Sequence, residues 1–172
     1  MAKLIILEGL SRTGKTTISE KLKDEGIGRI ISLTDKRPAD TDIRSFYKGV
    51  SLALNEFYRA FPEETFILDR SFLSELVYSE LFDRQSSTTD EYINDLIKSN
   101  DITVFYLYNE YEDYLNRSPK DRHVFSEIEY RVLKDLFKKN RIEIEFKELA
   151  IHSIDTSKNN LEEVYNIIKK QI

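Results

Sequence analysis

A glycine-rich segment near the start of the chain has residue types and a spacing that suit it to hold a phosphate group. Residues 9–16, "GLSRTGKT", match the pattern G-x-x-x-x-G-K-[ST]. Glycines let such a backbone curl so that its amide hydrogens point at anionic oxygens, and the following helix presents its positive end. We expect Lys15 to contact the β- and γ-phosphates and the Thr16 hydroxyl to bind Mg²⁺. A plain glycine turn between a strand and a helix is the alternative.

The backbone and side chains of this loop are expected to bind the nucleotide together. Arg12 lies inside the loop, where its guanidinium can neutralise charge on a phosphoryl group during transfer. The residues predicted to contact the nucleotide here are Gly9, Leu10, Ser11, Arg12, Thr13, Gly14, Lys15, Thr16 and Thr17.

An acid and an arginine follow the third apolar run of the chain, in "FILDRS". Asp69 and Arg70 are therefore expected at the edge of a sheet, beside the glycine-rich loop. Asp69 can hold Mg²⁺ directly or through water, and the fork of Arg70 can bind a phosphate. A helix-start acid next to a solvated arginine would give the same pair.

A basic polar break between two helices, "NRSPKDR", contains Arg117, Lys120 and Arg122. Arginines delivered by a mobile segment can neutralise a phosphoryl group and exclude water during transfer. We expect a short lid at about residues 116–124, with Arg117 and Arg122 as catalytic cations. A solvated charge run is the alternative.

Two further features are candidates for substrate binding. The polar loop at residues 34–41, "TDKRPADT", follows the second apolar run and brings Asp35 and Arg37 to the edge where α/β sheets bind ligands. An ordinary solvated connection is its alternative.

Aromatic side chains supply the second candidate feature, since Phe46, Tyr47 and Tyr78 are expected near a substrate base. Tyr78 lies eight residues after Arg70, about two helical turns, so its ring can border the group that the arginine holds. A core position is an equal alternative for each ring.

Short apolar runs alternate with segments of helical spacing along the whole chain. The apolar runs cover residues 3–7, 29–33, 65–68, 103–108 and 150–154. The helical segments cover residues 16–23, 42–61, 72–82, 89–99, 125–149 and 161–172. The apolar stripe of the longest segment is predicted at Phe125, Ile128, Val132, Leu133, Leu136 and Phe137. This alternation predicts an α/β fold, a five-stranded parallel sheet with helices on both faces.

Composition limits the class of protein. At 172 residues the chain is expected to form one domain, residues 1–172. A net charge of -5 argues against a nucleic-acid polymer as partner. With no cysteine and two histidines, the chain offers no disulfide, thiolate-metal site or histidine cluster for zinc. The first apolar run, about six residues, is too short for a signal peptide or a membrane span, so we expect a cytoplasmic protein.

Three motifs together resemble those of the thymidylate kinases and, more broadly, of the nucleoside and nucleoside monophosphate kinases of the P-loop class. The first is the opening "KLIILEGLSRTGKTT". The second is "DRSFLSELVYS", which matches the family pattern at Asp69, Arg70, Ser74 and Tyr78. The third is the closing "SIDTSKNNLEEVYNII". The motifs occur in the family's order, and the resemblance extends over the whole chain.

The resemblance implies a three-layer P-loop NTPase fold with a short lid, with ATP bound by the glycine-rich loop and Mg²⁺ served by Asp69. It implies that Arg70 holds the acceptor's phosphate, with Ser74 and Tyr78 in the same acceptor site. It also implies that Arg117 and Arg122 lie in the lid. The residues that it places near the adenine are Asp155, Thr156 and Ser157.

The chain departs from the thymidylate kinase pattern at three places. Ser11 stands where these kinases usually carry an acid. The loop "DKRPAD" replaces their R-E-P-G-G, and Ser71 follows Asp69 and Arg70 where an aromatic residue is usual. The "DRS" sequence is more similar to the E-R-S of the deoxynucleoside kinases.

The favoured function is therefore ATP-dependent phosphoryl transfer to a deoxynucleoside monophosphate, dTMP or a related or modified pyrimidine. Three alternatives stay open. A deoxynucleoside kinase would phosphorylate a 5'-hydroxyl, with Asp35 as its base. The others are a kinase acting on bases or ends of DNA, and a non-catalytic nucleotide-binding regulator. Family members are commonly dimers, and the apolar content of residues 42–61 would allow a homodimer.

Overall fold

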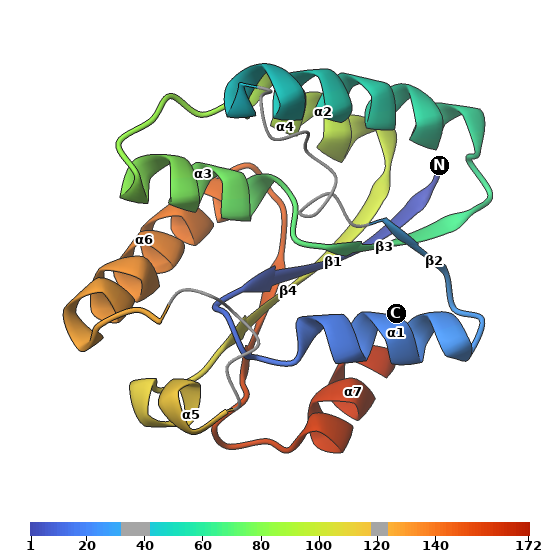
Figure 1. Cartoon of the computed structure of the whole chain (residues 1–172). Coiled ribbons are helices and arrows are strands. Elements are labelled where there is room, and N and C mark those ends of the chain that lie inside the picture. Colours follow the sequence, from blue (N-terminus) through green and yellow to red (C-terminus); the bar gives the residue numbers. More distant parts are fainter. Residues whose placement is uncertain (32–41, 118–123) are drawn as a thin grey trace.

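The centre of the protein is a parallel sheet built around its first strand (Figure 1). The structure is a computed structural model that describes residues 1–31, 42–117 and 124–172. Its strands are β1 (Lys3–Gly9), β2 (Arg29–Ile31), β3 (Thr65–Asp69), β4 (Asp101–Tyr108) and β5 (Ile151–Asp155). They are ordered β2-β3-β1-β4-β5, and every neighbouring pair is parallel. The predicted five-stranded parallel sheet is confirmed.

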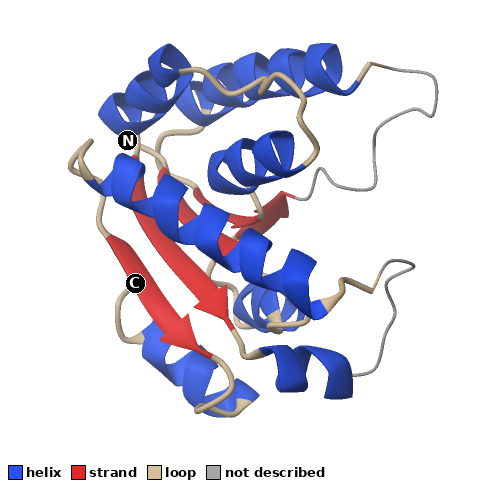
Figure 2. Cartoon of the chain, turned by 90° about the vertical axis from the view of Figure 1, so that its left-hand side faces the viewer, coloured by secondary structure: helices blue, strands red, loops and turns tan. Residues whose placement is uncertain are grey.

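Helices cover both faces of this sheet, so the molecule has three layers (Figures 1 and 2). The helices are α1 (Lys15–Asp24), α2 (Ile43–Ala60), α3 (Phe72–Leu81), α4 (Asp90–Ser99), α5 (Tyr111–Asn116), α6 (Glu127–Glu145) and α7 (Leu161–Lys169). α1 and α7 pack on one face, and α2, α3, α4 and α6 pack on the other. In the described part of the chain, no helix is long and apolar enough to cross a membrane.

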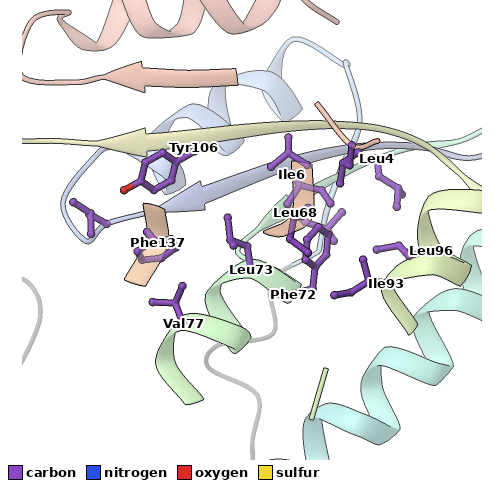
Figure 3. Packing of buried hydrophobic residues seen from close by; sticks show 14 of the residues in the cluster. Leu4, Ile6, Leu68, Phe72, Leu73, Val77, Ile93, Leu96, Tyr106 and Phe137 are labelled. Atoms are coloured by element: carbon purple, nitrogen blue, oxygen red, sulfur yellow. The ribbon is translucent and has the colours of Figure 1, made fainter. Parts of the chain in front are cut away.

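β1 alternates its side chains between two separate hydrophobic cores. Leu4 and Ile6 belong to a core with α3, α4 and α6, and part of that core is drawn in Figure 3. Ile5 and Leu7 belong to a core with α1 and α7. A strand in the middle of a parallel sheet is buried on both faces, which explains why residues 4–7 of β1 are all apolar.

The strand register brings the ends of three strands together. Leu7 of β1 pairs with Asp69 of β3, and Gly9 of β1 pairs with Leu107 of β4. The loops that leave these strands therefore start at one edge of the sheet, where open α/β sheets bind their ligands.

The predicted apolar stripe of the longest helix is confirmed at four of its six residues, since Phe125, Leu133 and Phe137 are buried and Leu136 packs against the same core. Ser126 caps α6 and forms a capping box with Glu129, so the helix begins at Glu127. Ile128 and Val132, both predicted in the stripe, are exposed. The described residues of α6 that are buried are Tyr130, Leu133, Phe137, Asn140 and Ile144. α5 was not predicted, because it is only six residues long and does not show a full amphipathic repeat.

Candidate active site

The glycine-rich loop joins the end of β1 to the start of α1, and its first glycine is required by a close backbone contact. A Cβ atom at Gly9 would lie 2.0 Å from the carbonyl oxygen of Leu107, and the φ of Gly9 is +121°. The next residue, Leu10, donates its amide to that same carbonyl at 3.1 Å. Gly14, at the other end of the loop, has a φ of +86°. Both glycines therefore hold backbone conformations that other residues rarely adopt.

Lys15 is buried at the start of α1 and its side chain lies back across the loop. Its Nζ donates to the carbonyl of Leu10 and, at 3.0 Å, to Oγ1 of Thr13. The ammonium is thus held within the curve of the loop, beside the helix N-terminus, where positive charge and free amides favour an anion. The contact of Lys15 with the β- and γ-phosphates stays a prediction.

Thr16 and Asp69 are brought together from two elements, as predicted for a metal pair. The Thr16 hydroxyl donates to Oδ2 of Asp69 at 2.6 Å, although the two residues are 53 positions apart. A hydroxyl and one carboxylate are oxygen ligands of the kind that Mg²⁺ accepts, because this ion usually keeps waters and takes further oxygens from a substrate phosphate. The two residues fit such an ion.

Arg70 lies between the glycine-rich loop and α3. Its Nη1 donates to the carbonyl of Gly9 at 2.9 Å and to Oγ of Ser74 at 3.1 Å, and its Nη2 lies 3.5 Å from Oγ of Ser11. Its guanidinium carbon is 5.4 Å from the centre of the Tyr78 ring. The φ of Arg70 is +71°, which is uncommon for a side chain of this size and often marks a functional site.

A pocket of about 270 Å³ opens beside Arg70, between α2, α3 and α4. Five predicted residues line it: Tyr47, Asp69, Arg70, Ser74 and Tyr78. Phe46 is not among the described residues that line it, and its ring packs edge-on against Tyr47 at 5.4 Å. The other described lining residues are Ser51, Leu54, Leu68, Ser71, Phe72, Glu75, Arg84, Ser87, Thr88 and Tyr92. The pocket combines apolar walls with a few polar groups, as small-molecule sites do.

Two arginines join the glycine-rich loop to α5 and to the start of the expected lid. Nη1 of Arg12 donates to the carbonyl of Tyr114 at 2.7 Å, and its guanidinium carbon lies 4.2 Å from the centre of the Tyr114 ring. Nη1 of Arg117 donates to the carbonyl of Arg12 at 2.8 Å and to Oγ1 of Thr156 at 3.2 Å. The loop, the end of α5 and the β5–α7 connection therefore contact one another.

The three residues expected near the adenine lie at the end of β5. Thr156 also accepts from Nη2 of Arg117 at 2.6 Å, through its carbonyl. Oγ of Ser157 accepts from the amide of Glu110, and Oδ1 of Asp155 accepts from the amide of Ser157. Asp35, Arg37 and Arg122, and most of the lid, lie outside the described residues.

No family model matches the sequence, and no curated protein matches it. The YorR protein of Bacillus subtilis, solved in complex with phosphorylated GDP, is 25% identical with a TM-score of 0.69, over 98% of this chain and 94% of that one. Deoxyadenosine kinase of M. mycoides with bound dATP is 15% identical with a TM-score of 0.62, over 98% of each chain.

A third solved structure of the same kind is thymidylate kinase of Candida albicans. It is 17% identical with a TM-score of 0.61, over 99% of this chain and 91% of that one. The chain has the fold of the thymidylate kinase-like P-loop kinases. The alignments extend over nearly all of both chains in each of these three comparisons.

Two acids of this P-loop kinase fold were missed by the sequence analysis. Glu75 forms a two-bond ion pair with Arg84 at 2.7 and 2.8 Å in the pocket wall, and also accepts from Oγ of Ser87 at 2.9 Å. The hydrogen bonds that Arg84 donates to Glu75 raise the pKa of Arg84. Arg84 lies in an irregular polar segment after α3, so no periodic pattern indicated it.

Glu8 is the second missed acid, and it is completely buried at the end of β1. It accepts hydrogen bonds from the amides of Ser71 and Ser74 and from the Ser74 hydroxyl. Burial raises the pKa of Glu8, against the opposing effects of the Ser74 hydrogen bond and of the Arg70 charge. One signal was present in the sequence: this acid is a single charge inside an otherwise apolar run.

Proposed function

We propose that the protein is an ATP-dependent kinase that phosphorylates a deoxynucleoside monophosphate, with dTMP or a related pyrimidine nucleotide as acceptor. The observation that carries this proposal is the position of Arg70 between the glycine-rich loop and a separate pocket. An enzyme that transfers a phosphoryl group from one nucleotide to another needs a donor phosphate site and an acceptor site side by side. The arginine stands where an acceptor phosphate must approach the donor.

In this proposal each group has one task. Lys15 and the loop amides bind the β- and γ-phosphates of ATP, and Thr16 and Asp69 hold Mg²⁺. Bound there, the ion supplies positive charge to the phosphate oxygens. Arg70 binds and orients the acceptor phosphate, and Tyr78 borders its sugar and base. Because a phosphate oxygen is already a nucleophile, no general base is required.

A deoxynucleoside kinase is the second candidate, and one observation favours it. Asp69 and Glu75 both line the pocket, so a carboxylate is available near an acceptor hydroxyl. A hydroxyl must lose its proton to attack a phosphate, and a carboxylate within reach can take it. Asp35, the base predicted for this alternative, lies outside the described residues, and its role stays a prediction.

The deciding experiment measures ADP release with ATP and Mg²⁺ over a panel of acceptors. The panel contains dTMP, dUMP, dCMP, dAMP and dGMP, the matching deoxynucleosides, and single-stranded and double-stranded DNA. We expect turnover with a pyrimidine deoxynucleoside monophosphate. Turnover with deoxynucleosides alone would establish the second candidate. ATP binding without any turnover would contradict both and favour a nucleotide-binding regulator.

We also propose that residues 1–172 act as a single domain, in the cytoplasm and as a homodimer. α2 carries the exposed apolar side chains Leu52 and Phe57, and Phe61 follows at its C-cap, so a second copy would cover all three. Sedimentation velocity at micromolar concentration tests the dimer. A single monomer peak at all concentrations would contradict it.

A further inference from the structure

Glu8 is a buried acid that lies behind Arg70, the residue to which the proposed function assigns the acceptor phosphate. The side chain comes from β1, is fully buried, and is not among the described residues that line the pocket. We propose that Glu8 is a positioning residue, whose ionised carboxylate fixes the start of α3 and, through Ser74, the guanidinium of Arg70. This proposal rests on the proposed function, because it assigns to Arg70 the acceptor phosphate.

The first part of the argument is that Glu8 caps α3. Ser71 is the N-cap residue of this helix, yet its side chain makes no capping hydrogen bond within the described structure. Oε1 of Glu8 replaces it, accepting from the amide of Ser71 at 2.8 Å and from that of Ser74 at 3.3 Å. The first amides of a helix have no partner inside the helix, so a buried helix start needs such an acceptor. A residue of β1 therefore sets where α3 begins.

The second part is a relay from Glu8 to Arg70. The Ser74 hydroxyl donates to Oε2 of Glu8, and Oγ of Ser74 in turn accepts from Nη1 of Arg70 at 3.1 Å. A hydroxyl has one hydrogen, so donating to Glu8 turns the lone pairs of Ser74 toward the arginine. Nη1 also donates to the carbonyl of Gly9 at 2.9 Å, which is the residue after Glu8. The arginine is thus oriented by two consecutive residues of β1.

The third part concerns charge. Only the ionised carboxylate accepts from every donor around it, and the cation of Arg70 lies on the far side of Ser74. Burial opposes ionisation and raises the pKa of Glu8. Strongly perturbed pKa values of buried groups cluster at functional sites. Arg70 also keeps a left-handed backbone, which must be held by its surroundings.

The relay predicts that loss of the Glu8 charge impairs binding of the acceptor and not binding of ATP. Losing the charge of Glu8 leaves Arg70 less well oriented, and Arg70 serves the acceptor in the proposed function. The groups assigned to ATP are held by other contacts, namely Lys15 within the loop and Thr16 with Asp69. The KM for the acceptor should therefore change and the KM for ATP should not.

The test is the substitution Glu8→Gln, which keeps the shape and the acceptor for both amides. It removes the charge and turns a donor toward Ser74. With ATP and dTMP as substrates, we expect the KM for dTMP to rise about tenfold, with the KM for ATP changed less than about twofold. The wild-type KM for dTMP should also rise toward acid pH, as Glu8 protonates, and the variant should lack this step. A merely structural role would lower the melting temperature and change both KM values together.

A matched pair of serine variants provides the control. Ser74→Ala removes the relay, whereas Ser79→Ala removes another buried hydroxyl of α3 that donates only to the carbonyl of Leu76. We expect the first to resemble Glu8→Gln and the second to resemble the wild type. The double variant Glu8→Gln/Ser74→Ala should be no worse than Ser74→Ala alone, since both remove one relay. If Glu8→Gln does not fold, the serine pair carries the test.

A second measurement is independent of turnover. Hydrogen exchange followed by NMR should show faster exchange at the amides of Ser71 and Ser74 in Glu8→Gln, because the acceptor of both loses its charge. Unchanged exchange together with an unchanged KM for dTMP would overturn the positioning role. If the wild type turns over no acceptor of the panel, the proposed function fails, whereas unchanged exchange in the variant defeats the inference about Glu8 alone.

Discussion

The hydroxyl of Thr16 lies 2.6 Å from Oδ2 of Asp69, so the first turn of α1 and the end of β3 present two oxygen ligands side by side. If this pair holds Mg²⁺, Asp69→Asn removes the only negative charge of the pair. We expect the Mg²⁺ concentration for half-maximal activity to rise about tenfold. A magnesium titration of ADP release measures it. Asp101→Asn, at an exposed acid of β4, is the control and should leave the titration unchanged.

The buried position of Lys15 makes its charge a second target. Lys15→Met keeps the length of the side chain and removes the ammonium that the loop encloses, so we expect turnover to fall about a hundredfold or more. The ADP-release assay measures turnover, and thermal unfolding monitors the fold. Lys23→Met, exposed on the same helix, serves as control. Unchanged turnover in Lys15→Met would refute the assignment of the phosphate loop.

Substitution of Arg70 separates the two candidate functions. If the acceptor brings its own phosphate, Arg70→Ala should raise the acceptor KM by about tenfold or more, because a charged contact to the bound acceptor is lost. If the acceptor is a nucleoside, the loss should appear chiefly in kcat. Initial rates over a matrix of ATP and acceptor concentrations give both constants. A loss confined to the KM for ATP would contradict both assignments.

The ion pair of Glu75 and Arg84 lies in the pocket wall, with side-chain exposures of 11% and 24%. Arg84→Met leaves the carboxylate facing the pocket without its cation. We expect a changed order of preference among the bases of the panel and a loss of stability of about 1 kcal/mol. Arg131→Met, which breaks an exposed pair with Glu127 on α6, is the matched control. An unchanged base preference would place the pair outside substrate recognition.

Glu8 should leave a signature in the stability of the protein as well as in its kinetics. Its pKa is raised above the ordinary 4.5, so the folded state holds this proton more tightly than the unfolded state. The resulting stabilisation is fully present below about pH 4.5 and is lost as the pH rises through the folded pKa. The free energy of unfolding of the wild type, relative to Glu8→Gln, should therefore fall with rising pH and then level off.

Urea unfolding of both proteins between about pH 4 and 8 measures this difference. At the upper end we expect Glu8→Gln to be at least as stable as the wild type, although its acceptor KM is higher. A difference that grew with rising pH would mean that the pKa of Glu8 is lowered, and would contradict the prediction.

The parts of the fold and site that depend on neighbours in sequence were predictable. Gly9, Gly14 and Lys15 follow a local pattern, because a tight phosphate-binding turn needs its residue types at fixed spacing. The sheet followed from apolar runs that are buried on both faces. Asp69, Arg70, Ser74 and Tyr78 all border the pocket, as expected of residues after a strand end.

The parts that depend on distant contacts could not be predicted. Glu8 acts on α3 across 63 positions of sequence, and its partners are backbone amides, which no side-chain pattern indicates. Ile128 and Val132 of α6 are exposed because the side of the helix that packs on the core is the one that carries Tyr130, Leu133 and Phe137. Arg84 is held in the pocket wall by its ion pair with Glu75, nine positions earlier in the sequence. The roles of Asp35, Arg37 and Arg122 stay predictions.

The alternation of side chains along β1 divides the interior into two compartments. Ile5 and Leu7 belong with the helix that follows the phosphate loop, whereas Leu4 and Ile6 belong with the helices around the pocket. If a substitution changes the volume of a side chain in one core, the side chains of that core repack, because the backbone of the sheet separates the two cores. The helices around the pocket can therefore change in sequence, and the pocket can come to bind a different acceptor. The packing beneath the phosphate loop need not change with them.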